Sequence, residues 1–303
     1  MKKSCPVCSA FLVYNKLYEY VKCDTCGSYI YISDRTAEDD NRIFYNSVFS
    51  FAAEQRYSMV KKKLFRYYDQ KDKKKNRGQY LKLDNINAEI NSIFQENAKI
   101  MEVGFGEGRH LLRLLESGYD AYGIDLADDV VSAFKQKYPQ YKDCVRVGTD
   151  FDEKVDVVYC SALIEHLDSP GKFVDNASSS LAAGGFLIIN AVPVINERNS
   201  NIDFNEDICF WKPCHRVIFS HKGITGMLHD KGYALSNYSI FDVYNYKLLS
   251  LHLKNGYDEI INIRHTCVKD NKLPGMHKYF NLCREALHIH SFALAGVYIF
   301  CKQ

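Results

Sequence analysis

The chain has 303 residues, which is enough for one large α/β domain with a small appendage but a tight fit for two full-size domains. Its 47% hydrophobic and 25% charged residues are typical of an ordinary globular protein and exclude a disordered, collagen-like or coiled-coil chain. The formal net charge of +2 excludes a chain that binds nucleic acid through its overall charge.

Membrane and secretion signals are missing from the sequence. No run approaches the roughly 18 consecutive apolar residues that a membrane span needs. Cysteines stand near the N-terminus, where a signal peptide would have its apolar segment. We therefore expect a cytoplasmic protein, in which most of the eleven cysteines are reduced, buried thiols.

Residues 1–32 contain two closely spaced cysteine pairs, Cys5 with Cys8 and Cys23 with Cys26. Each C-x2-C pair places two thiolates on a tight turn, and four thiolates at one centre suit a tetrahedral zinc ion. Residues 11–22 have the pattern of a strand, a turn and a strand, so the segment predicts a zinc ribbon. Because all four ligands are cysteines, no position is left for a substrate, and we expect a structural zinc. The alternatives are four ordinary cysteines or a redox C-x-x-C pair, and the redox pair would need a βαβ context that this segment lacks.

Residues 33–83 are polar and aromatic-rich, and their pattern predicts a helical connector with a basic run at 61–82. Such runs are usually solvated faces of helices. The alternative is a contact for phosphates, either on a nucleotide-linked substrate or on RNA.

From residue 84 onward, helical patterns alternate with apolar strands, which predicts a parallel sheet wrapped by helices in an α/β domain at 84–303. Strands are predicted at 99–103, 119–124, 144–147, 155–160, 186–191, 233–241 and 292–300. Helices are predicted at 84–96, 109–116, 128–137, 171–181 and 222–231, with a helical insert at about 246–290.

A glycine-rich turn, Glu102-Val103-Gly104-Phe105-Gly106-Glu107-Gly108, follows the strand at 99–103 and opens a helix. Glycines let the backbone approach a ligand, and a helix N-terminus offers free N–H groups. The spacing argues against a dinucleotide fingerprint, because Arg109 stands where the third glycine is required. Asp125 ends the next strand, where a carboxylate can accept hydrogen bonds from ribose hydroxyls. S-adenosylmethionine is the nucleoside-bearing cofactor that fits best.

Four segments, EVGFGEG, YGIDLADDVV, VGTDFDEKVDVVYCSALIEHLDSP and LAAGGFLIINAVP, resemble in order and spacing the motifs of class I S-adenosylmethionine-dependent methyltransferases. The resemblance covers about residues 84–245. It implies an enzyme with a Rossmann-like, seven-stranded, mostly parallel sheet. In that fold the last strand is antiparallel and inserted between its neighbours, and the strand at 292–300 would take this place.

The same resemblance implies a set of cofactor-binding residues. The glycine loop would line the methionine end, Asp125 and Leu126 would hold the ribose, and Asp150 and Phe151 would flank the adenine. Ser161, with Ala162 and Leu163 after it, would lie under the sulfonium. The full set is Glu102, Gly104, Phe105, Gly106, Gly108, Asp125, Leu126, Asp150, Phe151 and Ser161.

Methyl transfer to a hydroxyl requires orientation and a base, and histidine is the natural base at neutral pH. His166, after the fourth strand, and His215, before a later helix, are the candidate catalytic residues, and Glu165 is another possible base. Structural alternatives exist for both histidines. His166 could only pin its loop, and His215 could cap or pack the helix that begins near Ser220.

The zinc unit, the methyltransferase motifs and the His-x-x-x-Phe-Ser segment also resemble zinc-containing methyltransferases of nucleotide-linked sugars. In those proteins a Tyr-x-Glu-His motif supplies the base, whereas this chain has Lys212-Pro213-Cys214-His215. Their large C-terminal domain does not fit into the roughly 60 residues after Tyr244. We therefore expect methylation of a hydroxyl on a sugar, nucleotide-sugar or surface-glycan precursor. The alternatives are an RNA base methyltransferase that grips RNA with the ribbon and the 61–82 run, and a cofactor-binding interaction module without turnover.

Overall fold

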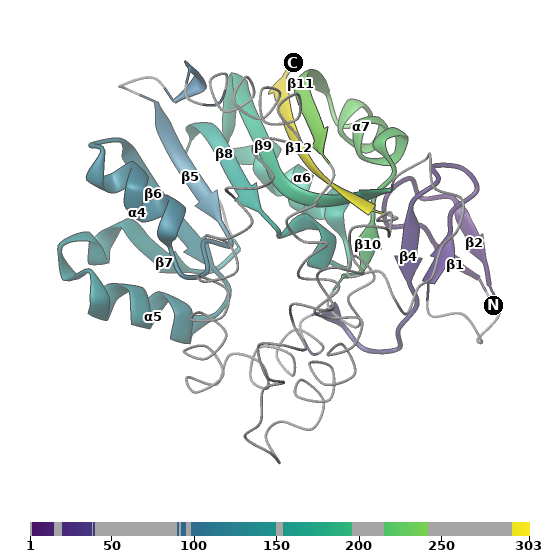
Figure 1. Cartoon of the computed structure of the whole chain (residues 1–303), viewed down its shortest axis with the longest axis horizontal. Helices are drawn as coiled ribbons and strands as arrows, with labels where there is room; N and C mark the ends of the chain where they lie inside the picture. The colour runs from purple at the N-terminus through teal and green to yellow at the C-terminus, as the bar shows by residue number, and fades with distance from the viewer. Residues whose placement is uncertain are drawn as a thin grey trace, which may run out of the picture.

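The computed structural model describes residues 2–14, 20–37, 39, 90, 92–94, 98–149, 154–195, 215–241 and 293–303 (Figure 1). The basic run at 61–82 and the insert at 246–290 lie outside the described residues, as do nearly all of the predicted connector and most of the predicted helix at 84–96.

The centre of the molecule is a seven-stranded sheet in the order β11-β12-β9-β8-β5-β6-β7 (Figure 1). The strands are β5 (Lys99–Val103), β6 (Asp120–Asp125), β7 (Val145–Val147), β8 (Val155–Ser161), β9 (Leu181–Ile195), β11 (Tyr233–Phe241) and β12 (Ala293–Lys302). The pairs among β5 to β9 are parallel, whereas β12 is antiparallel to both β9 and β11. The predicted insertion of an antiparallel last strand between its neighbours is confirmed.

Helices cover both faces of the sheet, and the core is therefore double. Ile100 and Met101 in the central strand β5 are both fully buried, because successive side chains of a strand point to opposite faces. Ile100 packs with residues of α4 (Arg109–Glu116) and α5 (Asp128–Lys137). Met101 belongs to the cluster that contains residues of α6 (Pro170–Ser180) and α7 (His221–His229). The sheet domain also contains two short 3-10 helices, η1 (Pro139–Cys144) and η2 (Ile164–His166).

The strand β9 is much longer than the predicted strand at 186–191. Gly184 and Gly185 precede the predicted start, but pairing with β8 already begins at Leu181 and continues past a register shift. On the other side, β12 pairs with β9 out to Ile195. The glycines therefore mark an irregularity within the strand rather than its end.

The N-terminal segment forms two small hairpins, each with a cysteine pair at its turn, and together they are called the small unit below. β1 (Lys2–Ser4) pairs with β2 (Phe11–Val13), and β3 (Tyr20–Lys22) pairs with β4 (Tyr29–Tyr31), all antiparallel. A two-residue strand of the larger domain, β10 (Val217–Ile218), adds to the free edge of β4. This strand was not predicted from the sequence. Figure 1 shows the hairpins beside β10 and α7, so the small unit is joined to the sheet domain by strand pairing.

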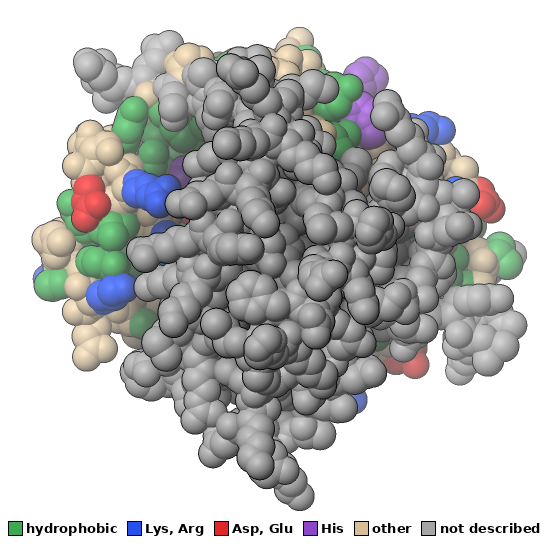
Figure 2. All heavy atoms as spheres, viewed as in Figure 1, with side chains coloured by type: hydrophobic (Ala, Val, Ile, Leu, Met, Phe, Trp, Pro, Cys, Tyr) green, Lys and Arg blue, Asp and Glu red, His purple; other side chains and the backbone are tan. Residues whose placement is uncertain are grey.

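The described residues contain no membrane-spanning helix, and their charged side chains are mixed on the face shown in Figure 2. Among the described residues, no helix is both long and apolar enough to cross a membrane. On the face shown in Figure 2, the coloured acidic and basic side chains are interspersed and form no extended patch of one sign.

Candidate functional site

The carboxyl ends of β5, β6 and β8 meet at the place where the chain reverses its direction of travel across the sheet. From β5 the chain proceeds through β6 to β7, and it then returns to β8 on the other side of β5. Ligands of open α/β sheets bind outside the carboxyl ends of strands at such a switch point. The predicted cofactor residues that the structure describes lie at the ends of these three strands or on the segments that follow them.

The glycine loop after β5 has three residues in left-handed backbone conformations, Gly104, Gly106 and Gly108, with φ angles of 70°, 53° and 69°. A Cβ atom at Gly104 would lie 2.9 Å from Leu163, and one at Gly108 would overlap the Phe134 ring. A Cβ atom at Gly106 would meet nothing within 4 Å. Packing therefore accounts for two of the glycines, whereas Gly106 faces open space.

Asp125, at the end of β6, is hydrogen-bonded to the glycine loop. Its Oδ2 accepts a hydrogen bond of 3.0 Å from the Gly106 N–H, and its Oδ1 accepts one of 3.0 Å from the Ala127 N–H. Parallel pairing of β5 with β6 brings these two turns together. The neighbouring Leu126 is 63% exposed, so an apolar side chain stands beside the carboxylate in solvent.

Glu102 is buried at 4% exposure and is held by His110, whose Nδ1 lies 3.1 Å from Glu102 Oε2. Burial raises the pKa of the Glu102 carboxyl, and the contact with His110 partly opposes that rise. The His110 ring stacks on Tyr159, with 4.1 Å between the ring centroids. Asn190 donates hydrogen bonds to the hydroxyls of Tyr159, at 2.8 Å, and Ser161, at 3.1 Å.

This network links Glu102 to Ser161 through three residues that were not identified from the sequence. His110, Tyr159 and Asn190 lie on α4, β8 and β9, and no motif spacing connects them. Burial along β8 does not single out Tyr159 either, because residues 157–160 are all buried between the two faces of the sheet.

Phe105, one of the predicted cofactor residues, has its side chain in the core. Its ring packs on Phe134, with 5.5 Å between the centroids, and the residue is 5% exposed. It therefore offers a ligand its backbone and not its ring. The predicted adenine-flanking residues Asp150 and Phe151 lie outside the described residues.

The segment after β8 approaches the glycine loop. Ala162 has a φ of 48°, a left-handed conformation that costs a non-glycine residue energy and that clusters at functional sites. Its N–H donates to the Asn190 carbonyl at 3.0 Å. The following residue, Leu163, is the one that packs against Gly104.

Glu165, His166 and His215 come together next to this segment. The ring centroids of the two histidines are 4.8 Å apart with an interplanar angle of 74°, and Glu165 Oε1 lies 3.8 Å from His166 Nε2. One ligating atom from each of the three residues lies within 4.8 Å of the others. Glu165 is 1% exposed, and burial raises the pKa of its carboxyl to about 8.

Backbone contacts hold His215 in this place. The Arg216 N–H donates to the Glu165 carbonyl at 2.7 Å, and the Tyr20 hydroxyl of the small unit donates to the His215 carbonyl at 2.7 Å. The cap of α7 is Ser220, whose side chain accepts from the Gly223 N–H at 2.7 Å. His215 is therefore not the N-cap of this helix.

Arg216 ties the small unit to the sheet domain and was not identified from the sequence. Its side chain is 4% exposed, and its Nε donates to Asp168 Oδ1 at 2.9 Å. It also donates to the Arg35 carbonyl, and its guanidinium lies 5.5 Å from the centroid of the Tyr31 ring. A buried guanidinium needs such partners, and here they come from both sides of the junction.

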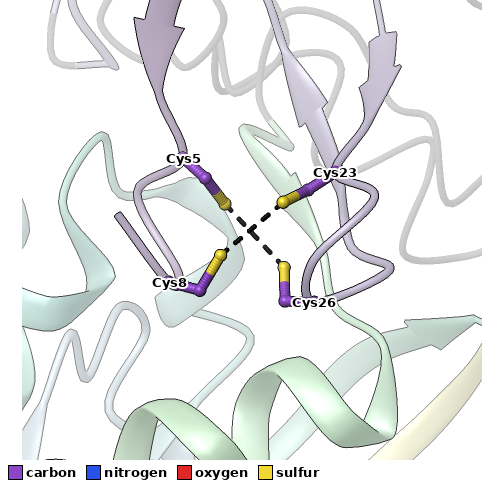
Figure 3. A group of neighbouring side chains, drawn as sticks. All are labelled: Cys5, Cys8, Cys23 and Cys26. Carbon is purple, nitrogen blue, oxygen red and sulfur yellow. Dashed lines mark hydrogen bonds between the residues drawn. The ribbon is translucent and has the colours of Figure 1, made fainter. Parts of the chain in front are cut away.

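The four predicted metal-binding cysteines converge on one point (Figure 3). The Sγ atoms of Cys5 and Cys26 are 3.8 Å apart, and those of Cys8 and Cys23 are 3.6 Å apart. Four sulfurs at ~2.3 Å from a tetrahedral zinc ion would be about 3.8 Å from one another. All four are free thiols, so both the donor set and its spacing fit zinc.

Comparisons with known proteins place this site in context. Residues 101–189 match the family model described as a methyltransferase domain. The ubiquinone biosynthesis O-methyltransferase of Hydrogenovibrio crunogenus is 26% identical over 121 residues, which are 37% of this chain and 50% of that protein. The chain thus spans half the length of the curated relative that it matches.

Two solved structures show a partial likeness. A methyltransferase from Thiobacillus denitrificans in complex with S-adenosyl-L-homocysteine is 16% identical with a TM-score of 0.46, covering 71% of this chain and 90% of that chain. A mycolic acid cyclopropane synthase is 15% identical with a TM-score of 0.48, covering 71% and 85%. The family model thus matches the central part of the sheet domain, and the strand order of the sheet is that of the Rossmann-like class I methyltransferase fold.

Proposed function

We propose that this chain, which carries a class I S-adenosylmethionine-dependent methyltransferase domain, methylates a hydroxyl group on a sugar, nucleotide-sugar or surface-glycan precursor. The observation that supports the proposal most directly is that one short segment after β8 contacts the glycine loop and also leads into the cluster of Glu165, His166 and His215. Leu163 contacts the glycine loop, and its carbonyl accepts from the His166 N–H at 2.9 Å. Groups suited to hold the methyl donor and groups suited to activate an acceptor therefore lie side by side. The likeness to an O-methyltransferase supports oxygen as the acceptor atom.

Asp125 and Gly106 are the proposed anchors of the methyl donor. Each oxygen of Asp125 accepts one hydrogen bond within the protein and keeps a lone pair for a ribose hydroxyl. The open space at Gly106 lets the ligand approach the loop backbone. The further proposed contacts of the donor are Glu102, Gly104, the Phe105 backbone, Gly108, Leu126 and Ser161, and Asp150 and Phe151 remain proposed adenine contacts.

The acceptor side consists of the Glu165, His166 and His215 cluster. S-adenosylmethionine supplies a methyl carbon that is already activated by the sulfonium, so the protein must orient the acceptor hydroxyl and provide for its proton. His166 and His215 present imidazole nitrogens on the acceptor side. We assign to this pair the role of accepting the proton of the acceptor hydroxyl. Glu165, beside His166, orients it.

The four cysteines complete the proposal as a structural zinc site. Four thiolates leave no open coordination position, so the ion would stabilise the small unit and take no part in methyl transfer. Through β10 and the Tyr20 hydroxyl, this unit holds the segment that carries His215.

Transfer of a labelled methyl group into a host extract tests the proposed acceptor. The extract is split into small-molecule, polysaccharide and RNA fractions after incubation with the full chain. Label in the nucleotide-sugar or glycan fraction supports the proposal. Label in RNA would replace it with RNA methylation, and cofactor binding without transfer to any fraction would indicate an interaction module.

Replacing His215 with alanine is expected to lower turnover by about 10²- to 10⁴-fold, the range typical of a lost acid–base group. The affinity for S-adenosylmethionine should be unchanged, since the proposed anchors of the donor are the glycine loop and Asp125. Steady-state kinetics and calorimetric binding check the two quantities. His229→Ala is the control, because that histidine is 85% exposed at the end of α7. A His215→Ala protein that no longer folds would instead support a structural role.

Replacing Gly106 with alanine is expected to weaken cofactor binding by roughly 5- to 100-fold, because a methyl group would project into the ligand space at a cost of about 1–3 kcal/mol. The control is Gly118→Ala, because Gly118 also has a positive φ, 83°, and a Cβ atom there would also meet nothing within 4 Å. Both variants should lose about 1–2 kcal/mol of stability from backbone strain. Equal cofactor affinity in the two variants would contradict the assignment of Gly106.

A further inference from the structure

We propose that Glu165, His166 and His215 bind a divalent transition-metal ion, in a site separate from the four cysteines, and that this ion holds the oxygen of the methyl acceptor. The second half of the statement rests on the proposed function, whereas the first half concerns metal binding alone. The donor set is two imidazoles and one carboxylate, the set that zinc and related ions accept while keeping positions open for a further ligand.

The geometry of the three side chains is close to that of a metal site. Donor atoms at about 2.0–2.2 Å from an ion are roughly 3.0–3.5 Å from one another. Glu165 Oε1 and His166 Nε2 are already 3.8 Å apart, and the three donors lie within 4.8 Å of one another. The two rings meet edge to face, at 74°, so their nitrogens can converge without stacking. Small side-chain rotations would bring the donors to ligand distance.

A buried oxygen without a partner points to a missing ligand at this position. Glu165 is 1% exposed, and its Oε2 has no hydrogen-bond partner among the described residues. Burying a carboxylate oxygen without a partner is costly, so such groups call for an explanation by an ion or another bound group. A cation held by the two histidines and by both oxygens of the carboxylate would satisfy Oε2 as well as Oε1.

The protein also fixes the backbone on which the three donors stand. Glu165 and His166 lie on the 3-10 helix η2. The Arg216 N–H bonds to the Glu165 carbonyl, and the Tyr20 hydroxyl bonds to the His215 carbonyl, each at 2.7 Å. Residues distant in sequence are therefore tied together before any ion binds, which reduces the cost of assembling the site.

A metal ion here changes how the acceptor is activated. A hydroxyl bound to the ion has a lowered pKa, so its O–H bond breaks with transfer of the proton to water. The oxygen then forms a bond to the methyl carbon while the carbon–sulfur bond breaks and S-adenosylhomocysteine leaves. In this arrangement the two histidines hold the ion and water takes the proton in their place, so His215→Ala would lower turnover through loss of the ion.

Manganese binding to the full chain loaded with only one zinc ion per chain, which the four thiolates take first, tests the site without any methyl donor or acceptor. Mn²⁺ prefers oxygen and nitrogen ligands and does not compete well for four thiolates, so paramagnetic resonance of free Mn²⁺ counts the new site alone. We expect one Mn²⁺ per chain. The variants His166→Ala and Glu165→Gln should weaken binding by more than ~100-fold, because even an outer partner of a ligand costs 10–100-fold. His229→Ala should leave it unchanged.

Two further measurements separate the outcomes. Cobalt titration of the same proteins should give d–d absorption without a thiolate charge-transfer band, and this signal should vanish in His166→Ala while the melting temperature of the variant stays near that of the parent. Absence of binding, or binding that His166→Ala and Glu165→Gln leave unchanged, overturns the site. Metal binding without methyl transfer to any fraction overturns the proposed function and leaves the site standing.

Discussion

Replacing Asp125 with alanine is expected to reduce the affinity for S-adenosylmethionine by roughly 100-fold or more. A hydrogen bond to a charged group contributes about 1.5–3 kcal/mol, and the substitution removes two acceptors for the ribose diol, so about 3 kcal/mol or more is lost. The variant also leaves the N–H groups of Gly106 and Ala127 without the carboxylate that now holds them. Both effects act in the same direction, since the glycine loop loses its anchor.

Isothermal calorimetry measures this change directly. Asp120→Ala is the matched control, because Asp120 is exposed at the opposite end of the same strand, β6. Asp125→Asn should lie between the parent and the alanine variant, since the amide keeps one acceptor oxygen. Affinity that is unchanged in Asp125→Ala would remove Asp125 from the cofactor site.

Replacing Cys23 and Cys26 together with serine is expected to lower the zinc content by one ion per chain and to unfold the small unit. Structural zinc contributes about 10–16 kcal/mol in small peptides, which is comparable to the roughly 5–15 kcal/mol stability of a whole domain. The small hairpins have three-residue strands and little core of their own, so we expect them not to persist without the ion.

The effect should extend to the proposed acceptor site through contacts that link the small unit to the sheet domain. The Ser220 hydroxyl donates to the Cys26 carbonyl, and the Ser220 N–H donates to Ser28 Oγ at 3.1 Å. β10 pairs with β4, and Tyr20 holds His215. We therefore expect turnover to fall much more than cofactor affinity, while the sheet domain stays folded at a lower melting temperature.

Metal analysis, circular dichroism and thermal unfolding check these expectations on the same sample. Cys144→Ser is the control, because Cys144 lies at the end of η1, apart from the four-cysteine cluster. A double variant that retains the full zinc content would contradict the four-cysteine site. A double variant with full turnover would contradict the coupling to His215.

Most of the sheet domain could be predicted from the sequence, because its elements have strong local signals. The helices α4 and α5 begin and end at the predicted residues; α4 follows the glycine turn, and α5 has two aspartates in its first turn. The alternation of strands and helices predicted that the strands pair in parallel. The antiparallel last strand, inserted between its neighbours, was predicted from the resemblance to class I methyltransferases. The juxtaposition of Gly106 and Asp125 also follows from the pattern, since carboxyl ends of neighbouring parallel strands share one edge.

Short or irregular elements were harder to predict for a physical reason. β10 has two apolar residues, which carry no periodicity, and it is a strand only because the edge of β4 accepts it. The glycines near the start of β9 are typical of a strand boundary, yet pairing on both sides continues the strand across them. Tertiary pairing overrides local preference in both cases.

By itself, the sequence determined the α/β domain, the glycine loop beside Asp125 and the spacing of the four cysteines, because each of these depends on residues that are close in sequence or related by strand order. Only the tertiary structure decided that His215 lies against Glu165 and His166, that Arg216 joins the small unit to the sheet domain, and that Ser220 rather than His215 caps α7. These contacts join residues far apart in the chain or depend on how the small unit docks. No periodicity or motif spacing encodes such contacts, and packing alone sets them.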